Sequence, residues 1–346
     1  MKEMRTRQGS MVGIATALMV FCFAGPSFGA DKADALWKQA KEFFAPLPQV
    51  MSSEKNPITP EKVRLGKMLL YETRISVDGT VSCTKCHPIS LYGADGLRKA
   101  IGNGCKVNPR NAPTIFNAAA QNFAHWIGNR LDVEDQARQS VTGMPAFGMP
   151  SNEAVEKRLK EIGYTDLFKQ AFPTDKEPVT VENFAKAIGA FERTLVTPAP
   201  FDAFLKGNQG ALNEKERRGL KTFMDMGCAR CHNSPYVGGQ MYQRFGLVDS
   251  YWNYTKSAAK DDGRYVVTKN EADRYVFKVP VLRNVAKTAP YFHDGSIDTL
   301  GEAVWIMGKV QLGKKLTTQQ VKDINAFLNA LTGEISQDAL IVPLLP

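Results

Sequence analysis

Two short motifs contain most of the residues in this chain that could bind a redox cofactor. They are Cys83-Thr-Lys-Cys86-His87 and Cys228-Ala-Arg-Cys231-His232, which use four of the six cysteines and two of the four histidines. Cys-X-X-Cys-His is typical of covalent c-type haem attachment, in which two thiols form thioethers with the haem and the imidazole becomes the proximal iron ligand. A zinc ribbon would place its second pair about 15–20 residues away, whereas these motifs begin 145 residues apart (228 − 83). The sequence therefore predicts two haems and iron redox chemistry, rather than a zinc ribbon or a thioredoxin-like dithiol.

Helices are expected to position these motifs, because helix signals are frequent and strand signals are sparse. An apolar stripe at helical spacing runs from Val181 to Leu195 behind Thr180, a good N-cap residue. Capping boxes open two further helices, at Thr299-Leu-Gly-Glu302 and at Thr317-Thr-Gln-Gln320. Helices are also expected over residues 60–71, 152–162 and 214–226, with long irregular stretches at 88–124 and 234–298. The predicted fold class is mostly α.

The length of the chain suits two domains. About 316 residues remain after a predicted leader of 30, which is within the range of a two-domain protein. The polar, glycine-containing stretch at 207–210 is the predicted boundary. We therefore expect two cytochrome c-like domains, 31–206 and 207–346, each with one covalently attached haem.

The first 30 residues have the pattern of a secretory signal peptide. A basic start is followed by an apolar stretch from Met11 to Ala24, and small residues suit cleavage near residue 29 or 30. That stretch is shorter than the roughly 20 residues of a membrane span, and no later segment approaches that length. Removing the leader lowers the net charge from +9 to +7, because it contains three basic residues and one acidic residue. The scattered basic residues suit charged protein partners and do not indicate a nucleic acid. The predicted location is the periplasm.

Several strings around the two motifs resemble those of a known family, the bacterial di-haem cytochrome c peroxidases with the related MauG enzymes. They are Leu65-Gly66, Arg74-Ile-Ser76, Asp78-Gly-Thr80, Ser82, Asn111-Ala-Pro-Thr-Ile-Phe-Asn117, Trp126, Gly128, Arg130, Phe277-Lys-Val-Pro-Val-Leu-Arg-Asn284, Pro290-Tyr-Phe-His-Asp-Gly295 and Met307-Gly308. The resemblance covers nearly all of the chain after the leader, and the strings occur in the family's order.

The resemblance implies an electron path between two unlike haems. A high-potential haem in the C-terminal domain collects electrons, and a low-potential haem in the N-terminal domain meets hydrogen peroxide. Met307 occupies the axial position opposite His232, where a thioether favours Fe(II) and raises the potential. The alternative for Met307 is a core side chain. MauG-like enzymes carry tyrosine here, so the methionine favours the peroxidase branch.

Other matched positions imply an interface between the domains. Trp126 matches an aromatic residue between the haems that relays electrons, although a buried core tryptophan is the alternative. Asn111, Thr288 and Pro290 match a calcium site, and oxygen ligands including backbone carbonyls suit Ca²⁺. His293 is expected to organise haem propionates and the domain interface rather than to bind iron.

The peroxide-binding end departs from the family pattern. Many members place a histidine in an Ile-Gly-His-Gly loop as a removable sixth ligand, whereas this loop reads Ile101-Gly-Asn103-Gly-Cys105. The first haem is therefore expected to have an open or water-bound distal side. Gln136 matches the family's distal glutamine. The distal glutamate, which performs general acid–base work, has no counterpart: no carboxylate lies between Gln136 and Ser151, and Ala146 or Gly148 stands near its place.

Several residues could fill this gap. Glu134, Asp135 or Glu153 would restore a carboxylate if one of them reaches the site. Cys105, a leftover thiol in an exported protein, either ligates the first haem or fills space, and the second reading is favoured. His125 stands where the family commonly has an aromatic residue, and it ligates iron, relays protons or packs.

The expected function is reduction of hydrogen peroxide to water, with electrons from a small cytochrome c or a cupredoxin. One alternative is a MauG-like oxidase of another substrate. A second is a non-enzymatic di-haem electron carrier, since the usual distal histidine and glutamate are absent. The family also implies a possible homodimer.

Overall fold

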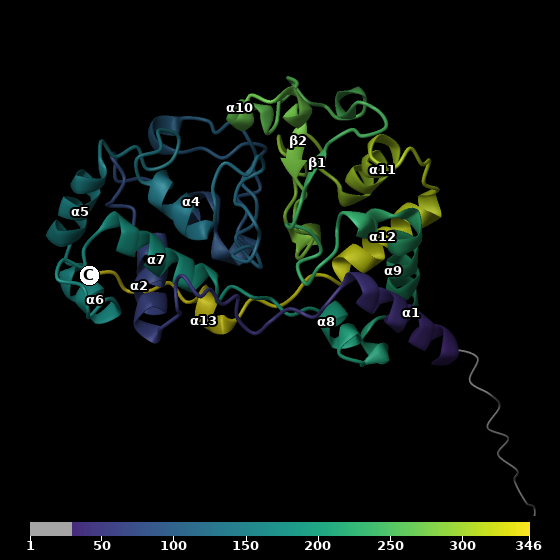
Figure 1. The fold of residues 1–346 in the computed structure, drawn as a ribbon, viewed down its shortest axis with the longest axis horizontal. Coiled ribbons are helices and arrows are strands. Elements are labelled where there is room, and N and C mark those ends of the chain that lie inside the picture. The colour runs from purple at the N-terminus through teal and green to yellow at the C-terminus, as the bar shows by residue number, and fades with distance from the viewer. Residues whose placement is uncertain (1–29) are drawn as a thin grey trace, which may run out of the picture.

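The fold is mostly helical, as the sequence predicts. The computed structural model describes residues 30–346, so the predicted signal peptide lies outside the described residues except at its last position. The helices are α1 Ala30–Phe43, α2 Pro60–Tyr71, α3 Cys83–Cys86, α4 Val133–Ser140, α5 Asn152–Glu161, α6 Thr165–Ala171, α7 Val181–Glu192, α8 Pro200–Leu205, α9 Glu214–Met226, α10 Tyr265–Thr268, α11 Leu300–Val310, α12 Thr318–Asn329 and α13 Gln337–Leu340. Two short strands, β1 Tyr242–Arg244 and β2 Val276–Lys278, pair antiparallel with Gln243 opposite Phe277. The helices gather into two halves placed side by side (Figure 1).

The first half is organised around α7, which packs against α2 and α4. The predicted apolar stripe faces this core, where Phe184, Ile188 and Phe191 are buried. Thr180 caps the helix as predicted, because its Oγ1 accepts a hydrogen bond from Asn183 N at 3.1 Å. The predicted helix over 181–195 is confirmed as far as Glu192, where α7 ends and a turn carries the last residue of the stripe.

Close approach of backbones explains one glycine in each half. A Cβ on Gly66 of α2 would lie 1.9 Å from Ala187 O of α7, so only glycine allows these helices to cross at this distance. In the second half, a Cβ on Gly219 of α9 would lie 1.9 Å from Asp323 O of α12. These two helix crossings therefore set the spacing within each core.

The second half is built on α9 and α12, with α1 and α8 packed beside them. The predicted capping box at the start of α12 is confirmed: Thr317 N donates to Gln320 Oε1 at 2.9 Å, and Gln320 N donates to Thr317 Oγ1 at 3.2 Å. At α11 only half of the predicted box forms. Thr299 Oγ1 accepts from Glu302 N at 3.3 Å, but the Glu302 carboxylate faces Lys256 Nζ at 3.8 Å instead.

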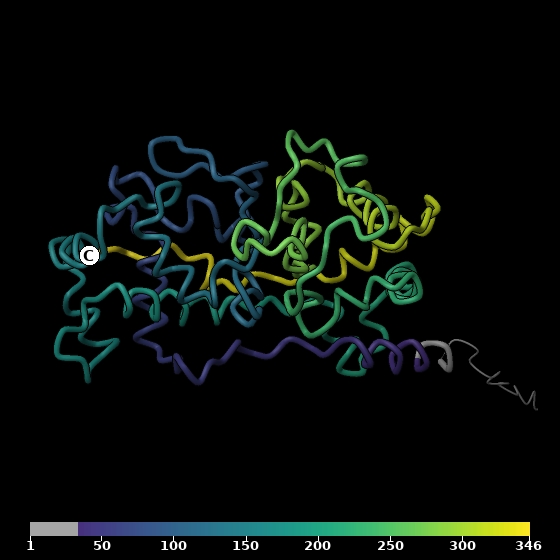
Figure 2. Tube along the Cα trace, turned by 45° about the horizontal axis from the view of Figure 1, so that its top comes forward, coloured from purple at the N-terminus to yellow at the C-terminus, as the bar shows by residue number. Residues whose placement is uncertain are grey.

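The two halves exchange segments, which no local sequence signal indicates. Three stretches cross between them, at about 44–59, 193–199 and 331–336, and Figure 2 shows the purple and yellow segments running the length of the molecule. α1 and α8 pack in the second core, where Phe201 lies 5.1 Å from Phe327 between ring centroids. Ala339 of α13 is buried in the first core. Packing therefore groups α8 with the second half, whereas the sequence places the boundary after it.

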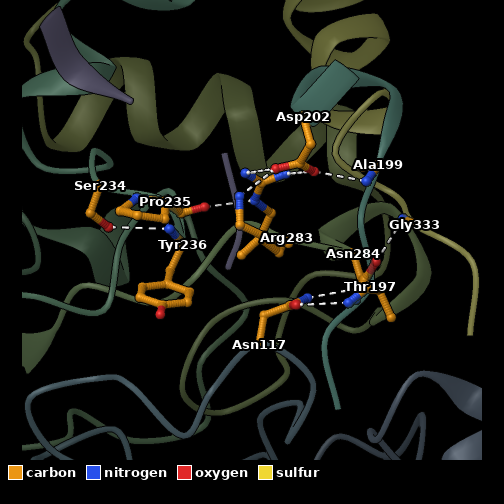
Figure 3. Close-up of polar contacts among 11 residues, drawn as sticks. Asn117, Thr197, Ala199, Asp202, Ser234, Pro235, Tyr236, Arg283, Asn284 and Gly333 are labelled. Carbon is orange, nitrogen blue, oxygen red and sulfur yellow. Dashed lines mark hydrogen bonds and ion pairs between the residues drawn. The ribbon is translucent and has the colours of Figure 1, made fainter. Parts of the chain in front are cut away.

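A buried ion pair holds two of the crossing segments. Asp202 of α8 accepts hydrogen bonds from Arg283 at 2.7 and 3.0 Å, and both side chains are almost fully buried (Figure 3). The same carboxylate accepts from the main-chain N–H groups of Leu47 and Ala199, each at 2.7 Å. Leu47 lies near the start of the first crossing segment and Ala199 at the end of the second. The Asp202 carboxylate therefore fixes both segments.

A neighbouring amide network holds the third crossing. Asn284 Nδ2 donates to Thr197 Oγ1 at 2.9 Å, and its Oδ1 accepts from Gly333 N at 3.1 Å. Asn117 of the first half also donates to Thr197 Oγ1, at 2.7 Å. We call the groups around Asp202 and Asn284 the polar junction.

Candidate functional site

The first Cys-X-X-Cys-His motif forms a single helical turn that ends at its histidine. Ser82 precedes α3, and His87 N donates to Cys83 O at 2.9 Å. His87 Nδ1 lies 3.0 Å from Gly93 O. A carbonyl can only accept, so Nδ1 carries the proton and Nε2 is left as an electron-pair donor. This is the tautomer that an iron ligand requires. The site therefore fits the predicted haem.

The second motif has the same backbone arrangement. The turn Cys228–Arg230 is followed by His232, whose N–H donates to Cys228 O at 3.0 Å. His232 is buried, and its Nδ1 has no hydrogen-bond partner among the described residues. Burial lowers the pKa of His232 to about 4, so the imidazole is neutral and able to coordinate a metal. An orphaned buried imidazole beside two unbonded cysteines fits a haem ligand.

Met307 lies on α11, in the same half as the second motif. Its neighbours Val304 and Ile306 pack in the hydrophobic clusters of this half. Met307 itself is half-buried and joins none of the clusters formed by the described residues. This position suits an axial ligand better than a core side chain, but the assignment stays a prediction.

Two basic side chains near the contact between the halves also suit haem groups. Lys278 of β2 is buried and donates from Nζ to Gln121 Oε1, and burial lowers its pKa to about 7. Arg130 Nε is buried without a hydrogen-bond partner. Neither side chain forms an ion pair with a carboxylate within residues 30–346. Because a buried cation is costly without a counter-charge, haem propionates are the partners that this arrangement calls for. The sequence analysis gave these two side chains no role.

Trp126 lies where the halves meet. Its Nε1 donates to Asn111 O at 3.0 Å, and its carbonyl accepts from Lys278 N at 2.8 Å. The His293 ring lies 6.5 Å from the indole in an edge-on arrangement and stacks on Phe277 at 4.4 Å. Trp126 therefore contacts both halves, as the predicted relay requires.

The three residues of the predicted calcium site lie on two neighbouring segments. Asn111 N donates to His293 O at 2.8 Å, which places Asn111 beside the segment that contains Thr288 and Pro290. Asn111 Nδ2 donates to Leu97 O at 2.8 Å, so the amide oxygen stays available as a ligand. The donors are neutral oxygens, which suits Ca²⁺. A salt bridge between Arg110 and Asp261 (2.7 Å), which the sequence analysis did not identify, ties the Asn111 segment to a third segment, and Asp261 in turn lies 3.8 Å from His293 Nε2.

On the distal loops of the first half, Asn103 takes up the space beside Gly148. The amide is buried, and its Nδ2 donates to Met144 O and to Ala146 O, the latter at 2.8 Å. A Cβ on Gly148, which has φ +68°, would lie 2.6 Å from Asn103 Nδ2. Asn103 thus holds the 144–148 loop, and a carboxylate side chain at position 148 has no room.

None of the three carboxylates considered as substitutes is free. Both oxygens of Glu134 are engaged by Arg193 at 2.9–3.0 Å, and one also accepts from Asn56. Asp135 accepts hydrogen bonds from Leu131 N at 3.0 Å and from side chains of its own helix, α4. Glu153 is exposed on the first turn of α5. Gln136 is half-buried on α4 and remains the one predicted distal residue without a competing partner among the described residues.

Cys105 and His125 have different surroundings. Cys105 is exposed at φ +59°, so the prediction that it fills buried space is wrong. His125 is half-buried, and its Nδ1 lies 3.0 Å from Asn129 Oδ1. Burial, Arg130, His87 and Lys278 lower the pKa of His125 to about 4, and the Asn129 hydrogen bond only partly opposes them. His125 is therefore a neutral imidazole near the first haem motif.

Comparisons with known proteins agree with this reading. A family model described as di-haem cytochrome c peroxidase matches residues 60–210. The chain is 43% identical over 332 residues to the cytochrome c551 peroxidase of Pseudomonas aeruginosa, an alignment that covers 95% of this chain and 94% of that protein. The chain belongs to the di-haem cytochrome c peroxidase family. A cytochrome c551 peroxidase of Nitrosomonas europaea is 40% identical, with 92% of each chain covered.

A solved structure shows the same fold over most of the chain. It is a MauG-like protein associated with microbial copper homeostasis, with a TM-score of 0.77 and 29% identity, covering 86% of this chain and 97% of that one. Membership of the di-haem cytochrome c peroxidase family makes the chain an oxidoreductase with two c-type haems. Over residues 30–346, no helix combines the length and the apolar character needed to cross a membrane.

Proposed function

We propose that this protein is a periplasmic peroxidase that reduces hydrogen peroxide to water with electrons from a small cytochrome c or a cupredoxin. The observation that carries the proposal is the near full-length identity of 43% to a cytochrome c551 peroxidase. Electrons enter at the site of His232 and Met307, pass Trp126, and reach the site of His87. The haems supply the electron transfer when bound, and the chain holds the ligands, excludes water and positions the proton-transfer groups.

The contacts of Trp126 support this electron path. Its indole is hydrogen-bonded to the first half through Asn111 and its carbonyl to the second half through Lys278. Because both halves hold Trp126, the indole keeps a constant distance to the site of His87 and to the site of His232. Met307 supports the assignment of the second site as the electron entry, because a thioether ligand raises the potential of a haem.

The function is tested by steady-state turnover of hydrogen peroxide with a reduced small cytochrome c. We expect peroxide-dependent oxidation well above that of free haem, in the oxidised protein as isolated, because no distal histidine has to leave. A ferric EPR spectrum should show one high-spin haem beside one low-spin haem. A rate equal to that of free haem would instead favour a non-enzymatic electron carrier. The absence of a free distal carboxylate among the described residues supports that alternative.

We further propose that Ca²⁺ binds between the halves through the side chain of Asn111 and carbonyl groups of Thr288 and Pro290. Removing it with a chelator should lower peroxide turnover and loosen the contact between the halves, and added Ca²⁺ should restore both. Titration of the chelated protein with Ca²⁺ by calorimetry measures the site directly. No heat of binding, with turnover unchanged by the chelator, would contradict the calcium proposal.

A further inference from the structure

Reducing hydrogen peroxide requires a group that moves a proton between its two oxygens. The balanced reaction is HOOH + 2 e⁻ + 2 H⁺ → 2 H₂O, in which the O–O bond breaks and each oxygen leaves as water. A positioned acid–base group must lie within hydrogen-bond reach of the oxygens. Glu134, Asp135 and Glu153 are engaged or exposed, and Gly148 has no side chain. Gln136 can donate a hydrogen bond, but an amide does not exchange protons at neutral pH.

We propose that His125 is the proton-transfer residue of the first haem site, an inference that rests on the proposed function. His125 sits on a tight hairpin closed by Ala124 N donating to Arg130 O at 3.0 Å. Its own φ is +65°, a left-handed conformation that few non-glycine residues adopt. The hairpin therefore holds His125 in one orientation.

Contacts with the second half of the molecule fix the conformation of the hairpin that contains His125. A Cβ on Gly128, at φ +61°, would lie 1.7 Å from Tyr242 Oη, so the tip of the hairpin packs directly on β1. The adjacent Trp126 carbonyl accepts from Lys278 N at 2.8 Å, on β2. His125 is thus fixed by contacts that belong to the other half rather than by its own loop.

The ring of His125 is oriented for proton transfer. Asn129 Oδ1, which can only accept, lies 3.0 Å from Nδ1, so Nδ1 carries the proton and Nε2 has a free electron pair. Among the described residues, none hydrogen-bonds Nε2 and no aromatic ring packs on His125, in contrast to His232 and His293. The basic nitrogen of His125 therefore stays available to exchange a proton.

The hairpin of His125 runs directly into α4, which carries Gln136 and packs on α7 in the first core. His87 of the first motif, Arg130 and Lys278 are the charged or titratable groups close enough to act on it, and none of them is a carboxylate. In the proposed step, Nε2 takes a proton from one peroxide oxygen and returns it to the other as the O–O bond breaks. His125 is unchanged at the end, the two electrons come from the donor protein, and the two net protons come from solvent.

The test compares holoprotein variants His125→Phe and His125→Gln with Glu153→Gln as a matched control on an exposed side chain. The first readout is the rate at which cyanide binds the oxidised first haem, because hydrogen cyanide must lose its proton to a nearby base. We expect both His125 variants to slow this rate at least about tenfold and to lower peroxide turnover by about 10²–10⁴-fold, the usual contribution of a general acid–base group. The control should stay within about twofold, with the spectrum of the second haem unchanged throughout.

Two results would overturn the proposal. One is a cyanide rate and turnover in the His125 variants close to those of the wild type. The other is a low-spin first haem that becomes high-spin in His125→Phe, which would make His125 an iron ligand. His125→Gln keeps a polar side chain of similar size in case the phenylalanine variant does not fold. If the wild type itself turns over no peroxide, the proposed function fails, and the cyanide rates still decide for or against His125.

Discussion

The two proximal histidines are held in different ways, which bears on the potentials of their haems. His87 Nδ1 donates to Gly93 O at 3.0 Å, whereas the Val237 and Pro280 carbonyls beside His232 lack good hydrogen-bond geometry to its Nδ1. A hydrogen bond from Nδ1 makes the opposite nitrogen a stronger electron donor, and a stronger donor stabilises Fe(III). The first haem is therefore expected to have the lower potential, in agreement with the role given to each site.

Met307→Leu tests the other ligand of the second haem. Removing the thioether should convert this haem from low spin to high spin and lower its potential by a sizeable part of the roughly 0.8 V range that axial ligands cover. EPR and a redox titration measure both effects. Met241→Leu, at an exposed methionine of the same half, should change neither. A low-spin second haem in Met307→Leu would show that Met307 is a core side chain.

At the scale of single residues, the members of the two haem motifs could be predicted from the sequence, but long-range hydrogen-bond partners could not. Cys-X-X-Cys-His is a local pattern, so its spacing alone predicts His87 and His232. Asn103, by contrast, bonds to carbonyls of Met144 and Ala146. Those acceptors lie about 40 residues away in a loop of irregular conformation, and no periodicity indicates such a pairing.

Among the elements, helices with local start signals could be predicted from the sequence, but the helices that they pack against could not. Thr180 and Thr317 cap their helices as predicted, because a cap depends on residues three positions apart. The grouping of α8 with the second core depends on contacts such as Phe201 with Phe327, far apart in the sequence. The sequence boundary was drawn from loop composition, which carries no information on such contacts.

The last residue of α7, Glu192, has a carboxyl group in surroundings that disfavour its ionisation. Glu192 is buried, and burial together with the Glu134 carboxylate raises its pKa to about 8, partly opposed by Arg193. In the unfolded chain a glutamate has a pKa of about 4.3. Because the folded state binds this proton more tightly, stability falls as the pH rises from about 4.3 to about 8 and is lowest above that range.

Glu192→Gln should remove this dependence. At pH 5 the variant and the wild type should have similar melting temperatures, and at pH 9 the variant should melt higher, since the amide carries no buried charge. Melting temperatures of the holoprotein between pH 5 and 9 measure the difference. Glu182→Gln, on an exposed position of the same helix, serves as the control. A difference that is constant with pH would show that Glu192 does not titrate in this range.

Across the whole molecule, the polar junction links three crossing segments through very few groups. Asp202 alone accepts four hydrogen bonds, from Arg283, Leu47 and Ala199. Asp202→Asn leaves the Arg283 guanidinium buried without a counter-charge, which typically costs about 3–5 kcal/mol. We expect a loss of that size in the free energy of unfolding, measured by denaturant titration of the holoprotein.

The matched control is Asp225→Asn, which breaks an exposed pair with Lys221 at 2.6 Å. An exposed pair contributes about 0–1 kcal/mol, so this variant should be nearly neutral. Equal losses in the two variants would mean that the buried pair at the polar junction gives no special support to the arrangement of the halves.

The packing of α1 in the second core has a consequence for how the chain is assembled during synthesis. α1 is made early, yet it contacts α8 and α9, from residues 200–205 and 214–226, and shares a hydrophobic core with α12, from residues 318–329. The first core needs little beyond residue 195, so it can close while the rest of the chain is still emerging, and only Ile335 and Ala339 join it last. The N-terminal helix must wait for residues 200–226, and the core that it joins is complete only when α12 has been made. The second cysteine pair is therefore accessible to the machinery that attaches haem until the second half closes, and the slowest folding step should be the return of α1 to its distant partners.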